Sequence, residues 1–172
     1  PKEFMAALMS SVMENVNKFS EYILNCRRMM NIAILPPDIN EGESGFSVSD
    51  GGIRYGLSAI KSVGKPVVDV ILAERGKGGP FRSMEDFVGR MSMKEVNKRT
   101  LENFIKSGAL DTLPGTRRQK MAVAPTMLEE KARERKSMFE GQLSLFDIAG
   151  DEARDEFQIT FPDVGEYSKE EL

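Results

Sequence analysis

The residues best suited to chemistry lie in a short run near the middle of the chain, Lys61-Ser62-Val63-Gly64-Lys65. A turn of this composition can present backbone N–H groups to an anion, because Gly64 has no side chain to keep a phosphate away from the backbone. Lys61 and Lys65 flank the turn and add positive charge, and a helix beginning directly after it would contribute the positive end of its dipole. The run predicts an anion-binding turn, and an ordinary turn between two helices is the alternative.

Short apolar periodicities on either side of this run predict the helices that would position it. Leu57 and Ile60 give a short apolar helix before the turn, and residues 67–71 give the face of a helix that begins with Pro66. Proline is tolerated there because a first-turn N–H has no intrahelical partner. Helix, small-apolar-small turn and helix form the helix-hairpin-helix pattern, in which Val63 is the buried anchor. Such a motif contacts no base edges, so it would bind duplex DNA through the backbone without sequence preference.

A second, looser copy of the pattern follows. Leu101, Phe104 and Ile105 form the apolar face of a helix that ends near Lys106, and Thr116 can cap a basic helix running through residues 117–120. Two such hairpins would share one core and face successive stretches of DNA backbone. The predicted DNA-binding residues are Lys61, Ser62, Val63, Gly64, Lys65, Lys106, Ser107, Gly108, Thr116, Arg117 and Arg118.

Capping signals predict the remaining helices of this region. Ser83 with Asp86 and Ser92 with Glu95 are two capping boxes, and each would start a short helix. Pro125 should kink the last helix, which residues 127–139 continue with many charged side chains.

The N-terminal part predicts two more helices and a little β structure. An apolar stripe covers residues 2–13, and a second stripe begins after a break at 15–17 and carries Cys26, which is more simply a buried core residue than a redox group. Asn31 can close the second helix in a left-handed conformation, and residues 32–35 should leave it extended. Alternating residues around 49–52 predict a β-hairpin, which is the only β structure expected. The predicted fold class is therefore mainly α, a tandem helix-hairpin-helix domain with one small β-hairpin.

Charge is distributed unevenly along the 172 residues. The chain has a net charge of -3, but residues 54–120 hold 14 basic and 7 acidic side chains, and residues 140–172 hold 2 and 10. A basic segment beside an acidic tail is typical of a chain that meets a polyanion at one place, and a solvated charged face is the alternative. One cysteine and no histidine exclude an intramolecular disulfide and the usual zinc and His-based catalytic sites. We expect a reduced, cytoplasmic compartment and no membrane segment, since no apolar run approaches the ~18 residues that a span needs.

A short apolar motif stands at the start of the acidic tail, Gln142-Leu143-Ser144-Leu145-Phe146. Its three apolar side chains have no periodic partner in the sequence, so they need another surface to cover them. We interpret the run as a linear binding motif, and folding back onto the helical domain is the alternative.

Both ends of the sequence look interior to a longer protein. The first residue is Pro1, a helical pattern starts at once, and Ser168 with Glu171 resembles a capping box whose helix is cut off. A disordered acidic tail is the alternative reading of the second end. We expect the chain to be a piece of a larger polypeptide.

Several runs resemble one enzyme family in their order and spacing, the alpha subunits of bacterial DNA polymerase III. These runs are residues 27–41, 53–61, 79–83 and 97–111, and the resemblance extends over essentially the whole chain. Gln142 to Phe146 matches the family's internal clamp-binding motif at every position.

The resemblance implies an organisation and partners for the chain. Residues 1–45 would be the end of the fingers domain, 46–139 the tandem helix-hairpin-helix domain, and 140–172 an acidic connector. The implied partners are double-stranded primer-template DNA, the sliding clamp (beta subunit) through Gln142, Leu143, Ser144, Leu145 and Phe146, and the other holoenzyme subunits.

The resemblance also implies that the parent subunit is a magnesium-dependent DNA-directed DNA polymerase, a nucleotidyltransferase of DNA replication. No Asp-x-Asp pair is present here, so no catalytic residue and no cofactor is assigned to this segment, and the catalytic aspartates would lie upstream of Pro1. Two departures bear on DNA binding: Ser62 replaces a common glycine, and Pro66 lacks one N–H near the phosphate. A stand-alone helix-hairpin-helix scaffold or DNA-repair protein without catalysis is the alternative function.

Overall fold

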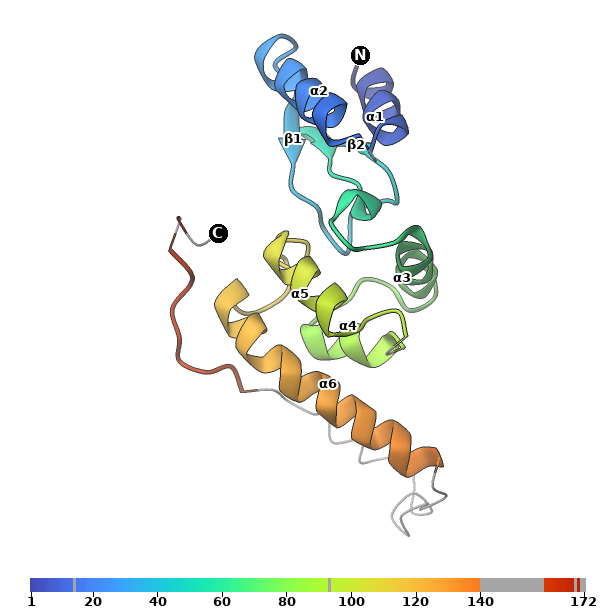
Figure 1. Ribbon diagram of the computed structural model, residues 1–172, viewed down its shortest axis with the longest axis vertical. Helices are drawn as coiled ribbons and strands as arrows, with labels where there is room; N and C mark the ends of the chain where they lie inside the picture. Colours follow the sequence, from blue (N-terminus) through green and yellow to red (C-terminus); the bar gives the residue numbers. More distant parts are fainter. Residues whose placement is uncertain (14, 93, 140–159, 169, 171–172) are drawn as a thin grey trace.

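The computed structural model describes residues 1–13, 15–92, 94–139, 160–168 and 170, which fold into helices around one small sheet. In chain order the elements are α1 (Lys2–Ser11), α2 (Val16–Arg28), β1 (Ala33–Leu35), β2 (Ser47–Ser49), β3 (Gly52–Arg54), the 3-10 turn η1 (Leu57–Ala59), α3 (Lys65–Gly78), α4 (Met84–Arg90), α5 (Lys98–Lys106) and α6 (Arg117–Phe139). Figure 1 shows an N-terminal lobe, made of α1, α2 and the strands, stacked along the long axis on a helical lobe, made of η1 and α3–α6. The mainly helical fold class is confirmed.

The N-terminal lobe is held together by an apolar cluster between its two helices and the sheet. Asn15 caps α2 by accepting a hydrogen bond from the backbone of Lys18 at 3.2 Å. The rings of Phe46 and Tyr55 meet at 4.9 Å between centroids. Cys26 is fully buried in this cluster, and burial raises the pKa of its thiol, so the core interpretation of this cysteine holds.

The sheet has one more strand than the sequence indicated. The predicted hairpin is present, with β2 antiparallel to β3, but β1 also pairs with β3 in parallel, so the expectation that the hairpin is the only β structure was wrong. Asn31 closes α2 with φ 50, as predicted, and turns the chain into β1. Gly52 permits the parallel pairing, because a Cβ there would lie 2.2 Å from the carbonyl oxygen of Ala33.

The helical lobe is built on one continuous apolar core. It includes the two turn anchors, Val63 and Ala109, and the T-shaped ring pair Phe87–Phe104, whose centroids lie 5.9 Å apart. The expectation that both hairpins share a core is thereby confirmed. Ser83 caps α4 as predicted, with its hydroxyl accepting from the N–H of Asp86 at 3.2 Å.

Two local predictions differ from the structure of this lobe. The helix expected at Leu57–Ile60 is only the 3-10 turn η1, because Ile60 already adopts extended backbone angles. The helix expected after Ser92 is absent from the described residues: the Ser92 hydroxyl accepts from the backbone of Lys94, two residues on, and so forms a turn instead of a helix cap. Pro125 lies inside α6, which continues on both sides of it, and the kink expected there stays a prediction.

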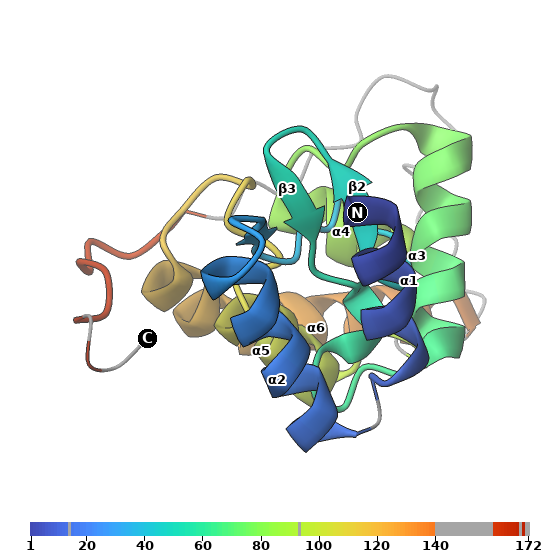
Figure 2. The same cartoon turned by 90° about the horizontal axis from the view of Figure 1, so that it is seen from above.

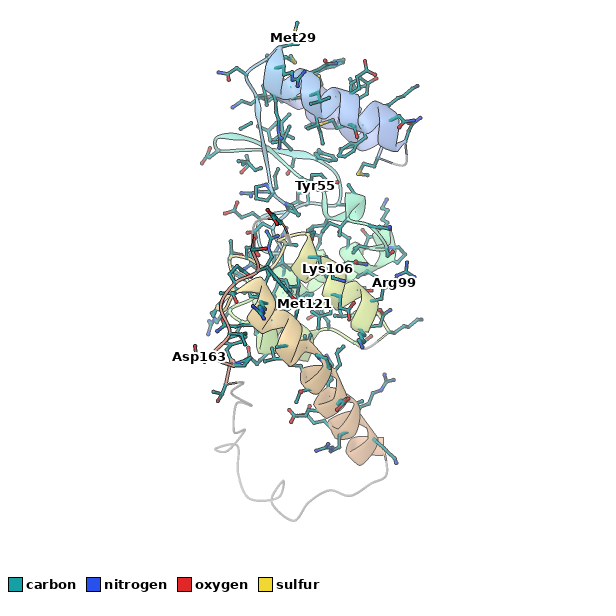
Figure 3. All side chains as sticks on the ribbon, turned by 60° about the vertical axis from the view of Figure 1, so that its left-hand side comes forward. Met29, Tyr55, Arg99, Lys106, Met121 and Asp163 are labelled. Atoms are coloured by element: carbon teal, nitrogen blue, oxygen red, sulfur yellow. The ribbon has the colours of Figure 1, made fainter. Side chains whose placement is uncertain are left out.

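A linking loop, residues 36–45, joins the two lobes. Ile39 is fully buried in the helical core, and its N–H donates to the carbonyl of Ala109 at 2.8 Å. The Asn40 side chain bonds both the N–H and the carbonyl of Phe81, at 2.8 and 2.9 Å. Arg75 of α3 donates to the carbonyl of Gly42 at 2.7 Å. Figure 3 labels Tyr55 between the lobes, where it packs against both cores.

The C-terminal segment, residues 160–168, runs beside the start of α6. Figures 1 and 2 both place this segment on the side of the molecule away from α3. Among the described residues, no helix combines the length and apolar character that crossing a bilayer requires. The predicted helix after Ser168 falls mostly outside the described residues.

Candidate nucleic-acid interface

The first turn, residues 61–65, is closed by backbone geometry at Ser62. This residue has φ 62, in the left-handed region, and the N–H of Val63 donates to the carbonyl of Ile60 at 3.0 Å. Val63 points into the core and is 5% exposed. A side chain in this conformation costs about 1–2 kcal/mol, which accounts for why glycine suits the position that Ser62 holds.

Beyond Val63 the turn opens into the N-terminus of α3. Gly64 is the cap residue and Lys65 the first helical residue, and within the described residues neither backbone N–H has a hydrogen-bond partner. Pro66 has no N–H, and the N–H of Val67 is already bonded to the carbonyl of Gly64 at 3.0 Å. Two N–H groups of exposed residues therefore remain without a partner among the described residues, at the positive end of a 14-residue helix.

The side chains around these N–H groups suit an anion. Lys61, Ser62 and Lys65 are all exposed. Gly64 has φ -81, and a Cβ there would meet only the Cδ of Pro66 at 3.6 Å, so the fold itself does not require glycine at this position. What the missing side chain provides is open access to the two N–H groups.

The second turn, residues 106–116, repeats the geometry of the first turn and then lengthens it. Gly108 has φ 81 and is followed by fully buried Ala109, just as Ser62 is followed by Val63. Ser107 lies half-buried at the end of α5, and its hydroxyl donates to the carbonyl of Phe104 at 3.1 Å. A longer loop then leads to α6, which agrees with the prediction of a looser second copy.

Thr116 caps α6 as predicted, in a complete capping box. Its hydroxyl accepts from the N–H of Gln119 at 3.2 Å, and the Gln119 side chain accepts from the N–H of Thr116 at 2.9 Å. The box leaves two first-turn N–H groups, those of Arg117 and Arg118. Both donate to the carboxylate of Glu166, at 3.0 and 3.2 Å.

The cations of the second hairpin are less available than those of the first. The Arg117 guanidinium bonds both carboxylate oxygens of Asp111, the closest at 2.6 Å, and these bonds raise the pKa of Arg117. Lys106 is exposed but pairs with Glu102 at 3.7 Å. Arg118 is exposed, and its guanidinium lies 5.9 Å from the ring centroid of Tyr167.

Lys120, the last residue of the basic run that was predicted to start this helix, is buried. It is 1% exposed and donates to the carbonyls of Leu110 and Leu113 at 2.7 and 2.8 Å, and desolvation lowers the pKa of its ammonium. The sequence contains a signal for this placement, because Lys120 shares the helical face of buried Ala124 and Met127. Its role is to hold the second turn in shape.

The remaining site predictions concern residues that the structure does not describe or does not bring together. The clamp-binding candidates Gln142, Leu143, Ser144, Leu145 and Phe146 lie outside the described residues. Among the described residues, no three His, Cys, Asp or Glu side chains are placed to hold a metal ion. Glu166 was missed, because no local pattern marks a contact between residues 48 or 49 positions apart.

Comparison with known proteins agrees with this geometry. The family model of the helix-hairpin-helix motif matches residues 31–120. The chain is 38% identical to DNA polymerase III subunit alpha of Chlamydia trachomatis over 160 residues, 93% of this chain and 13% of that protein. It is 40% identical to the subunit of Escherichia coli over 153 residues, 88% of this chain and 13% of that protein. It is 46% identical to the subunit of Pseudomonas aeruginosa over 114 residues, 66% of this chain and 10% of that protein.

The chain therefore spans only about an eighth of the length of the curated relatives it matches. The matched region runs from β1 through both turns to the start of α6. This region contains Val63 and Ala109, the two buried turn anchors, and the exposed N-terminus of α3. The chain belongs to the helix-hairpin-helix motif family, and the relatives that it matches over most of its length are DNA polymerase III alpha subunits.

Proposed function

We propose that residues 54–120 bind the backbone of duplex DNA without sequence preference, as part of a replicative DNA polymerase III alpha subunit. The observation that carries the proposal is the open N-terminus of α3. There the N–H groups of Gly64 and Lys65 have no partner among the described residues, and the side chains of Lys61 and Lys65 are exposed beside them. Backbone N–H groups and lysine ammonium groups recognise phosphate oxygens and carry no information about bases. The first turn would make the main contact, and Lys106 and Arg118 would add charge from the second hairpin.

The matched relatives favour a DNA polymerase III subunit over a stand-alone scaffold or repair protein. Three matched relatives are named as DNA polymerase III alpha subunits and align with most of this chain. In that setting the parent subunit extends primers in the bacterial cytoplasm with magnesium held elsewhere, and residues 46–139 serve as its duplex-binding domain. The described residues do not fit a magnesium site, since no three carboxylates among them converge.

A second attachment, to the sliding clamp, is proposed for Gln142 to Phe146. The support is the sequence motif itself, three apolar residues beside a glutamine at the start of an acidic tail. A clamp bound here would tie the polymerase to the DNA that the hairpins contact. Other holoenzyme subunits complete the proposed set of partners.

The lysines of the first turn are expected to set the salt dependence of DNA binding. Each phosphate contact contributes about -0.9 to the slope of log affinity against log salt, so Lys61→Ala and Lys65→Ala should each flatten the slope by about one unit. Fluorescence anisotropy of a labelled duplex over a salt series measures this slope. Lys18→Ala, an exposed lysine on α2, is the matched control and should leave the slope unchanged. Binding that ignores salt would contradict the proposal.

Gly64→Val is expected to weaken duplex binding about tenfold or more, because hydrogen bonds to charged groups contribute about 1.5–3 kcal/mol each. The branched side chain would cover the N–H groups of Gly64 and Lys65 without entering the core. Gly76→Val is the control: it lies on α3, and a Cβ there meets nothing within 4 Å. The same anisotropy assay compares the two variants on several sequences. Equal affinities of both variants for DNA would show that the first turn is not part of the interface.

A further inference from the structure

The C-terminal segment places a carboxylate where the second hairpin would receive a phosphate. The two oxygens of Glu166 accept from the N–H groups of Arg117 and Arg118, at 3.0 and 3.2 Å. With the capping box of Thr116 and Gln119, all four N–H groups at the start of α6 are bonded. No further anion can reach them while Glu166 stays in place.

Other residues of the C-terminal segment also contact the start of α6 and the loop before it, so the position of Glu166 does not depend on its own side chain alone. The Gln119 side chain donates to the carbonyl of Pro162 at 3.0 Å. The ring of Phe161 covers Gly115, where a Cβ would lie 2.8 Å from the ring, and packs against the helical core. Tyr167 lies under the Arg118 guanidinium. Figure 3 shows Asp163 of this segment beside the part of α6 that carries Met121.

The two hairpins therefore differ in whether the N–H groups at the start of their second helix already have hydrogen-bond partners. At α3 the N–H groups of Gly64 and Lys65 have no partner among the described residues, whereas at α6 the N–H groups of the first two helical residues, Arg117 and Arg118, hold a carboxylate. Carboxylate and phosphate present the same chemistry to a helix N-terminus: two negatively charged oxygens close enough together to bond successive N–H groups. A site of this geometry can hold one such group at a time.

The state of Glu166 fits this role. Partial desolvation opposes its ionisation, but the N–H groups of Tyr167, Arg117 and Arg118 outweigh that effect and hold the pKa of the carboxyl below its usual value. Glu166 is therefore charged at neutral pH.

We propose that Glu166 is a built-in substitute for a DNA phosphate: the C-terminal segment closes the second hairpin until duplex DNA displaces it. The inference rests on the proposed DNA-binding function and concerns its regulation. The first turn would make the initial contact, and the second hairpin would engage only after Glu166 leaves α6. The free domain then binds DNA more weakly than its two hairpins allow, because part of the site is occupied.

The test compares Glu166→Gln with Asp163→Asn. Both remove one negative charge from the same segment, but Asp163 is exposed and has no hydrogen bond or ion pair among the described residues. We expect Glu166→Gln to bind a labelled duplex about three- to tenfold more tightly at low salt, with a slope steeper by about one unit. Asp163→Asn should change neither quantity by more than a small long-range amount. Phe161→Ala, which loosens the segment without altering charge, should shift affinity in the same direction as Glu166→Gln.

The possible outcomes distinguish a failure of the Glu166 proposal from a failure of the proposed DNA-binding function. If the unmodified chain shows no salt-dependent duplex binding, the proposed function fails. If it binds and the Glu166 and Asp163 variants gain equally, the gain is general electrostatics and the phosphate substitute is overturned. If neither Glu166→Gln nor Phe161→Ala tightens binding, the segment does not compete with DNA, and the proposed function stands alone.

Discussion

Lys120→Met is expected to lower the free energy of unfolding by about 2–4 kcal/mol. The ammonium donates to the carbonyls of Leu110 and Leu113 from a position that is 1% exposed. Methionine fills similar space but removes the ammonium donor from both carbonyls, so the carbonyl of Leu110 keeps only the N–H of Leu113 as its partner. Charge-assisted bonds of this kind contribute about 1.5–3 kcal/mol each. The ammonium's own desolvation, seen in its lowered pKa, offsets part of that gain.

Thermal and urea unfolding, followed by circular dichroism, measure the effect. For a chain of this length the melting temperature should fall by roughly 5–15 °C. Lys18→Met, at an exposed position on α2, is the control and should change stability by less than about 0.5 kcal/mol. A Lys120→Met protein as stable as the control would show that the two hydrogen bonds contribute nothing net, and the structural role assigned to this lysine would be wrong.

Phe146→Ala is expected to weaken binding to the sliding clamp ten- to hundredfold. In the proposed complex Leu145 and Phe146 enter an apolar pocket, Leu143 packs at its rim, and Gln142 fixes the register by donating and accepting hydrogen bonds. Buried aromatic anchors of small interfaces typically cost about 2 kcal/mol or more on truncation, which corresponds to this range. The acidic residues that follow contribute solubility and add ordering entropy that limits affinity.

Calorimetry with a purified bacterial sliding clamp tests this attachment. Ser144→Ala is the matched control within the motif and should cost little, because its side chain adds no apolar anchor. Gly64→Val should leave clamp affinity intact, since the two sites lie on different segments. Equal affinity for the unmodified chain and a Leu145→Ala, Phe146→Ala double variant would exclude the anchor.

Features set by nearest neighbours in the sequence were predictable. Thr116 was identified as a cap because threonine often precedes a helix, and in the structure it and Gln119 satisfy two N–H groups locally. Asn31 was expected in a left-handed conformation because asparagine tolerates it. Val63 was identified as an anchor from its place in a three-residue turn. In each case the relevant energy arises within a few residues.

Features that depend on distant partners were not predictable. The parallel pairing of Ala33 with Gly52 exists only after two other elements have folded around it. Glu166 reaches α6 across 49 positions, and its own surroundings in the sequence are those of any acidic tail. Ser92 shows the opposite error: its local capping signal is real, but the Lys94 N–H satisfies it as a turn. Within the candidate site, the first turn was predictable from the sequence. The contact of Glu166 with the start of α6, which follows the second turn, was not.

The linking loop has a mechanical consequence. Its backbone is fastened to the helical lobe at several points: Ile39 to Ala109, Asn40 to Phe81, and Gly42 to Arg75. A connection with this many fixed points transmits force and rotation in place of absorbing them. A displacement imposed on α3 would therefore move the linking loop with the helical lobe through Arg75, and the loop would carry that movement to β1, the strand that directly precedes it.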